Sequence, residues 1–399
     1  MSSSPSPFAR RASARGLLAS HDAASLGALL GRVRGSASPA ASLAGKVLRH
    51  AFSRPEPGAW SDAALAEVGV GAWARAALLD LDPAPSLRIA EEALAEDGTV
   101  RLGLRAADGA FVESVIIPGP ARTTVCISSQ VGCARACTFC ETGRLGLMRQ
   151  MSSAEIVDQV RLARAVWSRR AGAQTTGHDG GAAPLQNIVF MGMGEPFDNL
   201  AEVLRAIRLL TEPRAFAFAP SRITVSTVGV ADKLAAFFAG ARAELAVSLN
   251  APDDARRSTI MPINTRVPLA RLREALEATL PPGRRVLFEY VLFDRWNDAL
   301  EDADLLAAYV AGLRCRVNVI PSNPGPDPTL RPPSPERLAA FIARLAGLGV
   351  TTLVRRPRGR DVGGACGQLA GALRAGALAG EASPMRSREE EEIGSPRAS

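Results

Sequence analysis

The segment CARACTFC (133–140) places three of the six cysteines of this chain within eight residues. Cys133, Cys137 and Cys140 are separated by three residues and then by two. Three thiolates can hold three irons of a four-iron, four-sulfur cluster and leave the fourth iron open to another ligand. Two other interpretations stay open at this point: a zinc site completed from elsewhere in the chain, or ordinary buried cysteines.

The composition is that of a large folded chain with a polyanionic partner. The chain has 399 residues, of which 47% are hydrophobic, so we expect two or more domains. A net charge of +7 favours a nucleic acid as partner. Six cysteines do not make a disulfide framework at this length, and no apolar run approaches the about 20 residues of a membrane span. We therefore expect a cytoplasmic protein with no membrane partner.

Shifts in composition divide the chain into five parts. The Arg- and Ser-rich start, 1–20, is expected to be disordered, and residues 21–95 show the Ala/Leu spacing of a small helical domain. Alternating apolar residues on both sides of ADGA predict a β-hairpin and linker over 96–122. Residues 123–375 form the expected core, and the acidic end, 376–399, is expected to be a disordered tail.

The core alternates predicted strands with amphipathic helices. Strands such as NIVFMGM, RITVSTVG and ELAVSLN are each followed by a helical pattern, which indicates parallel βα units in a barrel-like or open sheet. Polar and glycine-rich sequences, among them GMGEP, STVG, SLNAPDD and IPSNP, stand where these strands end. Because parallel βα folds place active sites at the carboxyl ends of strands, the loops predict one shared mouth.

The cysteine spacing, with Phe139 directly before the last cysteine, resembles the radical S-adenosylmethionine (SAM) superfamily, in which the open iron binds SAM. GMGEP (192–196) resembles the glycine-rich SAM-binding element of that superfamily. The resemblance narrows to the RlmN/Cfr family of RNA adenine methyltransferases, because further motifs follow in the expected order over 98–370. These motifs are VESVIIP, CISSQVGCARACTFC, MGMGEPFDN, LAVSLNAPDD, VNVIPSNP and GACGQLAG.

This resemblance implies an α/β fold: a partial (β/α)6 TIM-like radical SAM barrel with a small N-terminal helical domain, which contacts RNA, and a β-hairpin. It also implies a 4Fe–4S cluster and SAM as cofactors. Cys366 would carry a methyl group taken from a first SAM, and Cys126 would resolve the protein–RNA adduct through a transient disulfide with Cys366. Glu113 would accept the ring proton. The positions that match the cluster ligands are Cys133, Cys137 and Cys140. The positions that match SAM contacts are Gly194, Glu195, Ser226, Ser248, Leu249, Asn250 and Asn323.

The implied activity is methylation of carbon 2 of an adenine in 23S rRNA, with tRNA as a second candidate substrate and two SAM molecules consumed. An electron donor such as flavodoxin or ferredoxin is implied, and a monomer is expected. Methylation at carbon 8, the Cfr activity, uses the same cysteines, and a divergent RNA-modifying paralogue is a further alternative. A radical SAM enzyme acting on a peptide or small molecule would not need the pair Cys126 and Cys366. The non-enzymatic alternative is a zinc-stabilised RNA-binding module.

Several positions depart from the family pattern. Leu147 and Gln150 stand at changed positions after the cysteine cluster, and Asn250 stands where many members have histidine. A longer glycine-rich insertion, expected to be a surface loop, occupies 171–184. Because no cysteine is lost, these changes leave the expected chemistry intact and concern the choice of RNA substrate.

Two further features stand near the end of the core. RRPRGR (355–360) has four arginines in six residues directly before the Cys366 loop, which predicts a grip on RNA phosphate. Cys315 leads into a strand and is predicted to be a buried core residue.

Overall fold

The computed structural model describes residues 18–370, apart from 36–37, 53–59, 175–182, 324 and 326. The predicted disordered tail and nearly all of the predicted disordered start lie outside the described residues, and Leu18–Ser20 form a short helical turn, η1. Most of the predicted loop over 171–184 also lies outside them, although its first residues continue a helix to Gln174.

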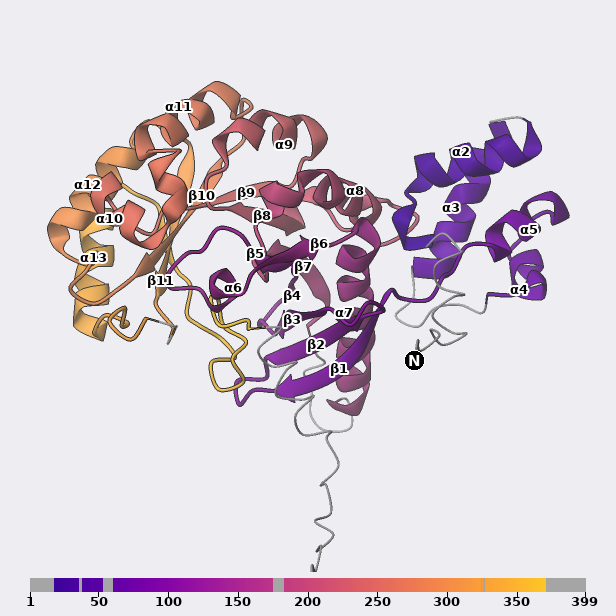
Figure 1. Ribbon diagram of the computed structural model, residues 1–399, viewed down its shortest axis with the longest axis horizontal. Coiled ribbons are helices and arrows are strands. Elements are labelled where there is room, and N and C mark those ends of the chain that lie inside the picture. The colour runs from indigo at the N-terminus through magenta and orange to yellow at the C-terminus, as the bar shows by residue number, and fades with distance from the viewer. Residues whose placement is uncertain are drawn as a thin grey trace, which may run out of the picture.

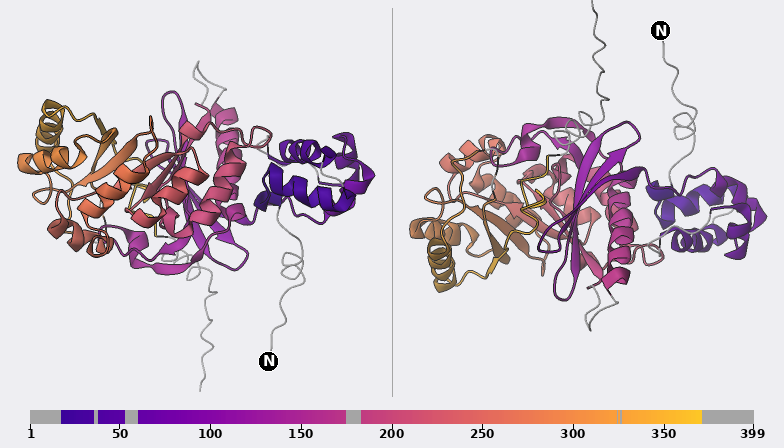
Figure 2. Two further views of the ribbon diagram at one scale, coloured as in Figure 1. Left: turned by 90° about the horizontal axis from the view of Figure 1, so that it is seen from above. Right: turned by 90° about the horizontal axis from the view of Figure 1, so that it is seen from below.

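Short helices make up the small N-terminal domain, which lies at one end of the molecule (Figures 1 and 2). They are α2 (Ala23–Arg34), α3 (Ser38–Phe52), α4 (Asp62–Glu67) and α5 (Ala72–Leu79). Asp22 caps α2 by accepting a hydrogen bond from the Ser25 N–H at 2.8 Å, and Ser61 caps α4 through the Ala64 N–H at 3.2 Å. Each cap satisfies a backbone donor that the first helical turn leaves unpaired.

The structure corrects the helical prediction over 21–95 at its C-terminal end, because Leu87–Leu94 form strand β1. The segment LRIAEEAL is rich in helix formers, but its more buried side chains, beginning with Leu87 and Ile89, alternate along one face. It pairs antiparallel with β2 (Val100–Ala106), with an irregularity between Ile89 and Glu91. Pairing with the neighbouring strand β2 has overridden the local helix propensity of this segment.

The hairpin predicted over 96–122 is present as β2 and β3 (Phe111–Ile117), which pair antiparallel with Gly103 opposite Glu113. β3 also pairs antiparallel with β4 (Thr123–Cys126), where Val115 lies opposite Cys126. The three antiparallel strands therefore extend the sheet of the core and bring Glu113 and Cys126 onto neighbouring strands.

The core is a partial barrel of parallel strands covered by helices (Figure 1). Its sheet continues from β4 in the order β7 (Leu185–Phe190), β8 (Ile223–Thr227), β9 (Glu244–Ser248), β10 (Val286–Leu292), β11 (Cys315–Pro321) and β12 (Thr352–Val354). The longer helices between the strands are α7 (Ser153–Gln174), α8 (Leu200–Thr211), α9 (Leu234–Gly240), α10 (Asp254–Ile260), α11 (Leu269–Thr279), α12 (Leu300–Val310) and α13 (Pro335–Gly347). Shorter turns are η2 (Pro196–Asn199), η3 (Pro220–Arg222), η4 (Ala231–Lys233) and η5 (Pro262–Thr265).

Among the described residues the end strands β1 and β12 do not pair with each other, so the barrel is open. Six parallel strands are each followed by at least one helix, and β12 adds a last short strand. This confirms the predicted α/β fold with a partial barrel. Within the part of the chain that the structure describes, no helix is long and apolar enough to cross a bilayer.

A separate two-stranded sheet holds the cysteine cluster. β5 (Gln130–Cys133) and β6 (Gly146–Gln150) pair antiparallel, with the short helix α6 (Glu141–Arg144) between them. Gly132 has φ +77°, and a Cβ atom there would collide with the carbonyl oxygen of Gly146 on the facing strand. Only glycine fits this position, directly before Cys133.

Candidate functional site

A cavity at the carboxyl ends of the parallel strands gathers most of the predicted site residues. Those that line it are Cys133, Cys137, Cys140, Gly194, Glu195, Ser226, Ser248, Asn250 and Cys366. The strands β7, β8 and β9 deliver the glycine-rich loop, Ser226 and Ser248, as expected for a parallel βα fold. The shared mouth that the loop sequences predict is therefore present.

The three clustered thiols face this cavity from the loop between β5 and β6. Burial, followed by repulsion from Cys140 and Cys133, raises the pKa of Cys137, and burial raises the pKa of Cys133 to about 12. Over residues 18–370 with their gaps, no three His, Cys, Asp or Glu side chains converge as ligands of a single metal ion would. A cluster instead takes one thiolate on each of three irons, and binding to iron removes the thiol protons.

The glycine-rich loop packs against β5 more closely than any side chain would allow. Gly194 has φ +95°, and a Cβ atom there would lie 2.5 Å from the Cβ of Gln130. The Gln130 side chain in turn accepts a hydrogen bond from the Glu195 N–H at 2.7 Å. The loop is thus held with its backbone at the wall of the cavity, next to the cluster cysteines.

Glu195 is a buried carboxylate at the same wall. Its oxygens accept hydrogen bonds from the N–H groups of Phe197 at 2.9 Å and Val228 at 2.8 Å. Burial raises the pKa of Glu195 to about 7. Among the described residues no arginine or lysine pairs with it, so this carboxylate fits a ligand that brings its own ammonium group. The amino-acid part of SAM has such a group, and the site therefore fits this cofactor.

The remaining predicted SAM contacts lie close by, and two of them, Leu249 and Asn323, do not line the cluster cavity. Asn250 adopts φ +60°, which asparagine tolerates, and its Oδ1 accepts a hydrogen bond from the Val291 N–H at 3.0 Å. Asn323 lines an adjoining cavity and donates to the Cys366 carbonyl at 3.0 Å. Leu249 is fully buried and does not line the cavity through its side chain.

Cys126 and Cys366 meet in a second cavity that adjoins the first. Both line it, and Cys366 also lines the cluster cavity, although 240 residues separate the two thiols in sequence. All six cysteines lie in described residues and are free thiols. Burial, followed by the charge of Cys366, raises the pKa of Cys126 to about 12. The predicted disulfide between them is not formed in this structure.

Glu113 of β3 lies in a buried ion pair and lines neither of the two cavities. Its Oε1 accepts a hydrogen bond from Arg101 at 2.7 Å, and its Oε2 accepts one from the Ala370 N–H at 2.8 Å. Arg101 also donates to the Val362 carbonyl at 2.7 Å. The pair therefore anchors the chain on both sides of Cys366.

The RRPRGR segment makes more internal contacts than the sequence predicts. Arg358 pairs with Asp97 at 2.7 Å, and Arg360 donates to the Asn323 side chain at 2.8 Å. Arg355 points inward, lines both cavities and donates to the Met191 sulfur at 2.9 Å. Arg356 is exposed and lines the second cavity.

Two charged residues shape these cavities: Glu289, which sequence reasoning missed, and Arg355, which it assigned to contact with RNA phosphate. Glu289 on β10 lines both of them, and its Oε2 has no hydrogen-bond partner among the described residues. Burial raises the pKa of Glu289, and Arg355 opposes that shift. Arg355 directly follows β12, and that strand-end placement could have identified it. Glu289 is the fourth of the seven residues of β10, so its place in the strand gave no such signal. Cys315, predicted to be buried, is half-buried and packs against the core.

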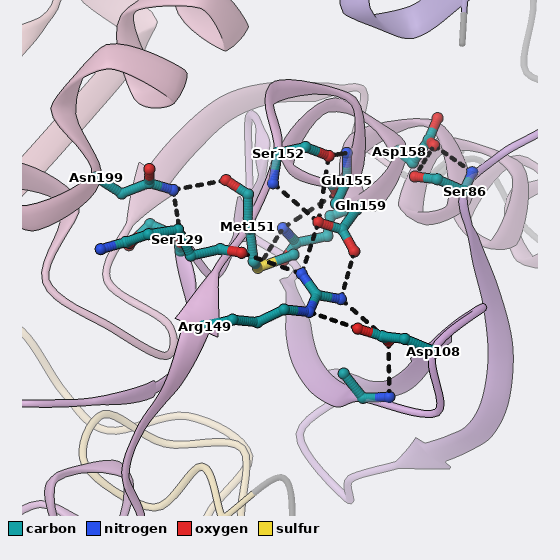
Figure 3. Close-up of polar contacts among 12 residues, drawn as sticks. Ser86, Asp108, Ser129, Arg149, Met151, Ser152, Glu155, Asp158, Gln159 and Asn199 are labelled. Atoms are coloured by element: carbon teal, nitrogen blue, oxygen red, sulfur yellow. Dashed lines mark hydrogen bonds and ion pairs between the residues drawn. The ribbon is translucent and has the colours of Figure 1, made fainter. Parts of the chain in front are cut away.

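A buried glutamine, Gln159, was also missed and ties the site elements together; Figure 3 shows it beside Met151 and Glu155. The Oε1 of Gln159 on α7 accepts hydrogen bonds from the Ser114 hydroxyl and the Ser128 N–H, both at 2.7 Å, and its Nε2 donates to the Ser128 carbonyl at 2.8 Å. The Ser128 hydroxyl donates to the Glu113 carbonyl at 2.6 Å and accepts from the Met193 N–H at 2.8 Å. Gln159 thus joins β3, the chain after Cys126 and the glycine-rich loop.

Arg149 links the two-stranded sheet of β5 and β6 to the hairpin and to α7, as Figure 3 also shows. From β6 it donates to Asp108 in the turn of the hairpin at 2.6 Å and to Glu155 at the start of α7 at 2.7 Å. Asn199 donates to the carbonyls of Ser129 and Met151, at 2.8 and 2.6 Å, and closes the base of the sheet. The loop with the three cysteines therefore rests on a fixed frame.

Comparison with known proteins agrees with this geometry. Residues 127–307 match the model of the radical SAM superfamily. A probable RNA methyltransferase of Sorangium cellulosum is 72% identical over 90% of this chain and 89% of that protein. A dual-specificity RNA methyltransferase RlmN of Anaeromyxobacter sp. is 45% identical over 74% of this chain and 77% of that protein. The crystal structure of a radical SAM methyltransferase from Sphaerobacter thermophilus has a TM-score of 0.75 and 38% identity, and it covers 89% of this chain and 99% of that chain.

The partial barrel and the three-cysteine cavity define a radical SAM enzyme. The extent of the match to the RlmN proteins, together with the pair Cys126 and Cys366, is more specific. The chain belongs to the RlmN/Cfr-like family of radical SAM RNA methyltransferases, which depend on a 4Fe–4S cluster and SAM.

Replacing Gln159 by leucine should weaken SAM binding about tenfold, because Ser128, whose hydroxyl holds Met193 beside Gly194, loses both of its backbone hydrogen bonds to Gln159. It should also lower the free energy of unfolding by about 2–4 kcal/mol, since buried donors are left unpaired. Equilibrium dialysis of the reconstituted protein with SAM and urea unfolding measure the two effects.

Asp158→Asn is the matched control, because Asp158 is the neighbouring buried residue of α7 and contacts Ser86 and Arg161 instead of the site. It should lower stability without changing SAM affinity. Equal SAM affinity in Gln159→Leu and wild type would contradict the role assigned to Gln159.

Proposed function

We propose that this enzyme methylates carbon 2 of an adenine in 23S rRNA, with tRNA as a second substrate, through a methyl group carried by Cys366. The observation that supports this most directly is the shared cavity of Cys126 and Cys366, which opens into the cluster cavity. A methyltransferase that moved its methyl group from SAM to RNA in one step would need neither thiol. Two SAM molecules are consumed for each methyl group transferred.

The residues divide the chemistry as follows. An adenine carbon is not a nucleophile, so it cannot take a methyl group directly from SAM and a radical route is needed. When bound, the cluster and SAM would supply a radical able to abstract hydrogen from a methyl group. Cys366 is the nucleophile that takes the first methyl group, beside the guanidinium of Arg355. Cys126 then attacks the Cys366 sulfur of the RNA adduct: a sulfur–sulfur bond forms and the carbon–sulfur bond breaks, with its electron pair left on the methylene carbon. A proton then converts that methylene into the methyl group on the adenine.

Glu113 is the acceptor of the ring proton in this scheme. Both of its oxygens already accept hydrogen bonds, from Arg101 and from the Ala370 N–H. Each carboxylate oxygen keeps a second lone pair, so Glu113 can take a proton while both hydrogen bonds remain.

The choice of RNA and of ring carbon is open to two alternatives. Methylation at carbon 8 would use the same two thiols. The relative with 72% identity carries the broad name of RNA methyltransferase, whereas the RlmN of Anaeromyxobacter sp. is 45% identical. This difference supports the second alternative, a divergent paralogue with another RNA target. The same proposal includes a flavodoxin or ferredoxin as electron donor, a monomeric state and a cytoplasmic location.

Cys126→Ala should trap a covalent RNA–protein adduct, because no thiol is left to release the product. Cys366→Ala should form no adduct, because no methyl group is loaded. Denaturing gel electrophoresis after reaction with total rRNA and SAM detects the adduct.

Cys315→Ala is the control for this pair, since Cys315 lies on β11 and lines neither cavity. It should methylate RNA as the wild type does. Equal methylation by the variants at Cys126 and Cys366 would refute the roles of both thiols.

Arg355→Gln should slow methylation of Cys366 about tenfold, equivalent to about 1.4 kcal/mol of transition-state stabilisation, because the thiolate loses its neighbouring cation. Arg355→Lys keeps the charge and should recover most of the rate. Mass spectrometry of the Cys366 peptide over time measures both rates. An equal deficit in Arg355→Gln and Arg355→Lys would show that the charge is not what matters.

Deletion of the gene should remove a single methyladenosine from the rRNA of the source organism. Mass spectrometry of nuclease-digested rRNA and tRNA, with methyladenosine standards for carbons 2 and 8, identifies the nucleotide. Loss of 8-methyladenosine would decide for the alternative regiochemistry, and unchanged rRNA with altered tRNA would reassign the substrate.

A further inference from the structure

We propose that Glu289 is a specificity-determining residue whose carboxylate accepts a hydrogen bond from the exocyclic amine of the target adenine. The inference rests on the proposed function, because it takes an adenine as the substrate base. It deepens that function by naming the group that distinguishes adenine from other purines. It applies to methylation at carbon 2 and at carbon 8 alike, because the amine is on carbon 6 in both cases.

Glu289 stands where the two cavities of the site meet. Its side chain, on β10, lines both the cluster cavity and the cavity shared by Cys126 and Cys366, here called the thiol cavity. In the sheet it lies between Ser248 of β9, which lines the cluster cavity, and Asn318 of β11, which lines the thiol cavity. Within the described part of the chain, Glu289 is the one acidic residue that lines the thiol cavity.

One oxygen of this carboxylate is held by a neighbour, and the other lacks a donor. Asn318 donates its side-chain N–H to Oε1 of Glu289 at 2.8 Å. Oε2 is buried and has no hydrogen-bond partner among the described residues, and only 5% of the residue is exposed. A buried carboxylate oxygen without a donor is costly, so it indicates a place to which a ligand brings one.

The neighbours of Glu289 favour its ionised form, which can only accept hydrogen bonds. Burial raises the pKa of Glu289, and the charge of Arg355 and the hydrogen bond from Asn318 oppose that rise. Arg355 donates to the Met191 sulfur at 2.9 Å and, in the structure as described, makes no hydrogen bond to Oε2. Arg355 therefore offsets the charge of Glu289, while Oε2 still needs an N–H or O–H donor.

The target adenine would bring such a donor to this wall. In the proposed scheme the reacting carbon comes within reach of Cys366, and the adduct then comes within reach of Cys126, so the base stands in the thiol cavity. Adenine carries an amine at carbon 6, whereas guanine carries an oxygen acceptor there. Oε2 would pair with the amine and repel the oxygen. The terminal torsion of a glutamate is broad, so this oxygen can turn toward the base.

SAM is the other molecule that brings donors to this region, in its amine and its ribose hydroxyls. Glu195 already offers an acceptor to the amine, and it lines the cluster cavity but not the thiol cavity. Asn318, which holds the Glu289 carboxylate, lines the thiol cavity but not the cluster cavity. The carboxylate is thus oriented from the side of the thiol cavity, which favours the RNA base over the cofactor as its partner.

The test measures how strongly the enzyme prefers adenine to purine, which is the same base without its amine. The probe is a synthetic 23S rRNA fragment around the adenine that the wild type methylates, located first by mass spectrometry of a treated transcript. A second fragment carries purine at that position. The reconstituted full-length enzyme methylates both at low RNA concentration, where the rate reports kcat/KM. Glu289→Leu removes the carboxylate, and Glu289→Gln keeps its shape without its charge.

Ser248→Ala is the matched control, since Ser248 is paired with Glu289 in the sheet and lines the cluster cavity but not the thiol cavity. It should weaken SAM binding, measured by equilibrium dialysis, and leave the preference for adenine over purine unchanged. The two Glu289 variants should do the opposite, with SAM affinity equal to that of the wild type.

Glu289→Leu should reduce the preference for adenine about tenfold to a hundredfold, as expected when a hydrogen bond to a charged group is lost. Glu289→Gln should reduce it in the same direction by a smaller factor. The different reactivity of the two bases cancels, because it is the same for wild type and variant. For a variant too slow to assay, competition binding of the two fragments measures the same preference.

An unchanged preference in both Glu289 variants would overturn the contact with the amine. Loss of SAM affinity as in Ser248→Ala, with the preference unchanged, would assign the carboxylate to the cofactor and overturn it as well. A wild type that methylates no adenine of the transcript would overturn the proposed function itself. The two failures are therefore distinguishable.

Discussion

The catalytic site depends on how closely backbone segments approach one another beside the cysteine cluster. A Cβ atom on Gly192 would lie 2.8 Å from the backbone of Ile127, one on Gly194 would meet Gln130, and one on Gly143 would lie 2.9 Å from the Cys137 carbonyl oxygen. These contacts bring the glycine-rich loop, the start of β5 and the cluster loop into one layer. With side chains at these glycines the loops would separate, and the cysteines and Glu195 would no longer share a cavity.

Buried polar side chains fix what the glycines allow to approach. Arg257 of α10 is fully buried and donates to the carbonyls of Leu249 at 3.1 Å, Val228 at 2.8 Å and Ser248 at 3.1 Å. It therefore ties together the chain ends after β8 and β9, where two predicted SAM contacts lie. Gln159 does the same on the other side of the mouth. Such groups are costly to bury, and their complete hydrogen bonding is what makes each loop adopt one arrangement.

The sequence alone predicts those elements whose structure is determined by residues close together in the chain. Alternating strands and helices, the hairpin around ADGA and the polar loops at strand ends each follow from residues adjacent in the chain. The helical reading of LRIAEEAL was wrong because its outcome depends on pairing with β2, a partner that composition does not reveal. Gln159, Arg257 and Glu289 were missed, and Arg355 was assigned to RNA phosphate, for a related reason: their roles come from contacts with distant segments.

The arrangement around Cys366 gives its thiol a limited range of movement. The Arg101–Glu113 pair holds the Val362 carbonyl on one side of it and the Ala370 N–H on the other. Between these anchors, Cys366 lines both the cluster cavity and the cavity it shares with Cys126. In the proposed scheme the Cys366 thiol meets SAM, then the adenine, then Cys126, so it has to turn between neighbouring spaces while its chain stays in place. The buried ion pair of the hairpin anchors both ends of the segment, so the chain stays in place while the thiol between the anchors can turn. In the proposed scheme the hairpin therefore takes part in positioning Cys366.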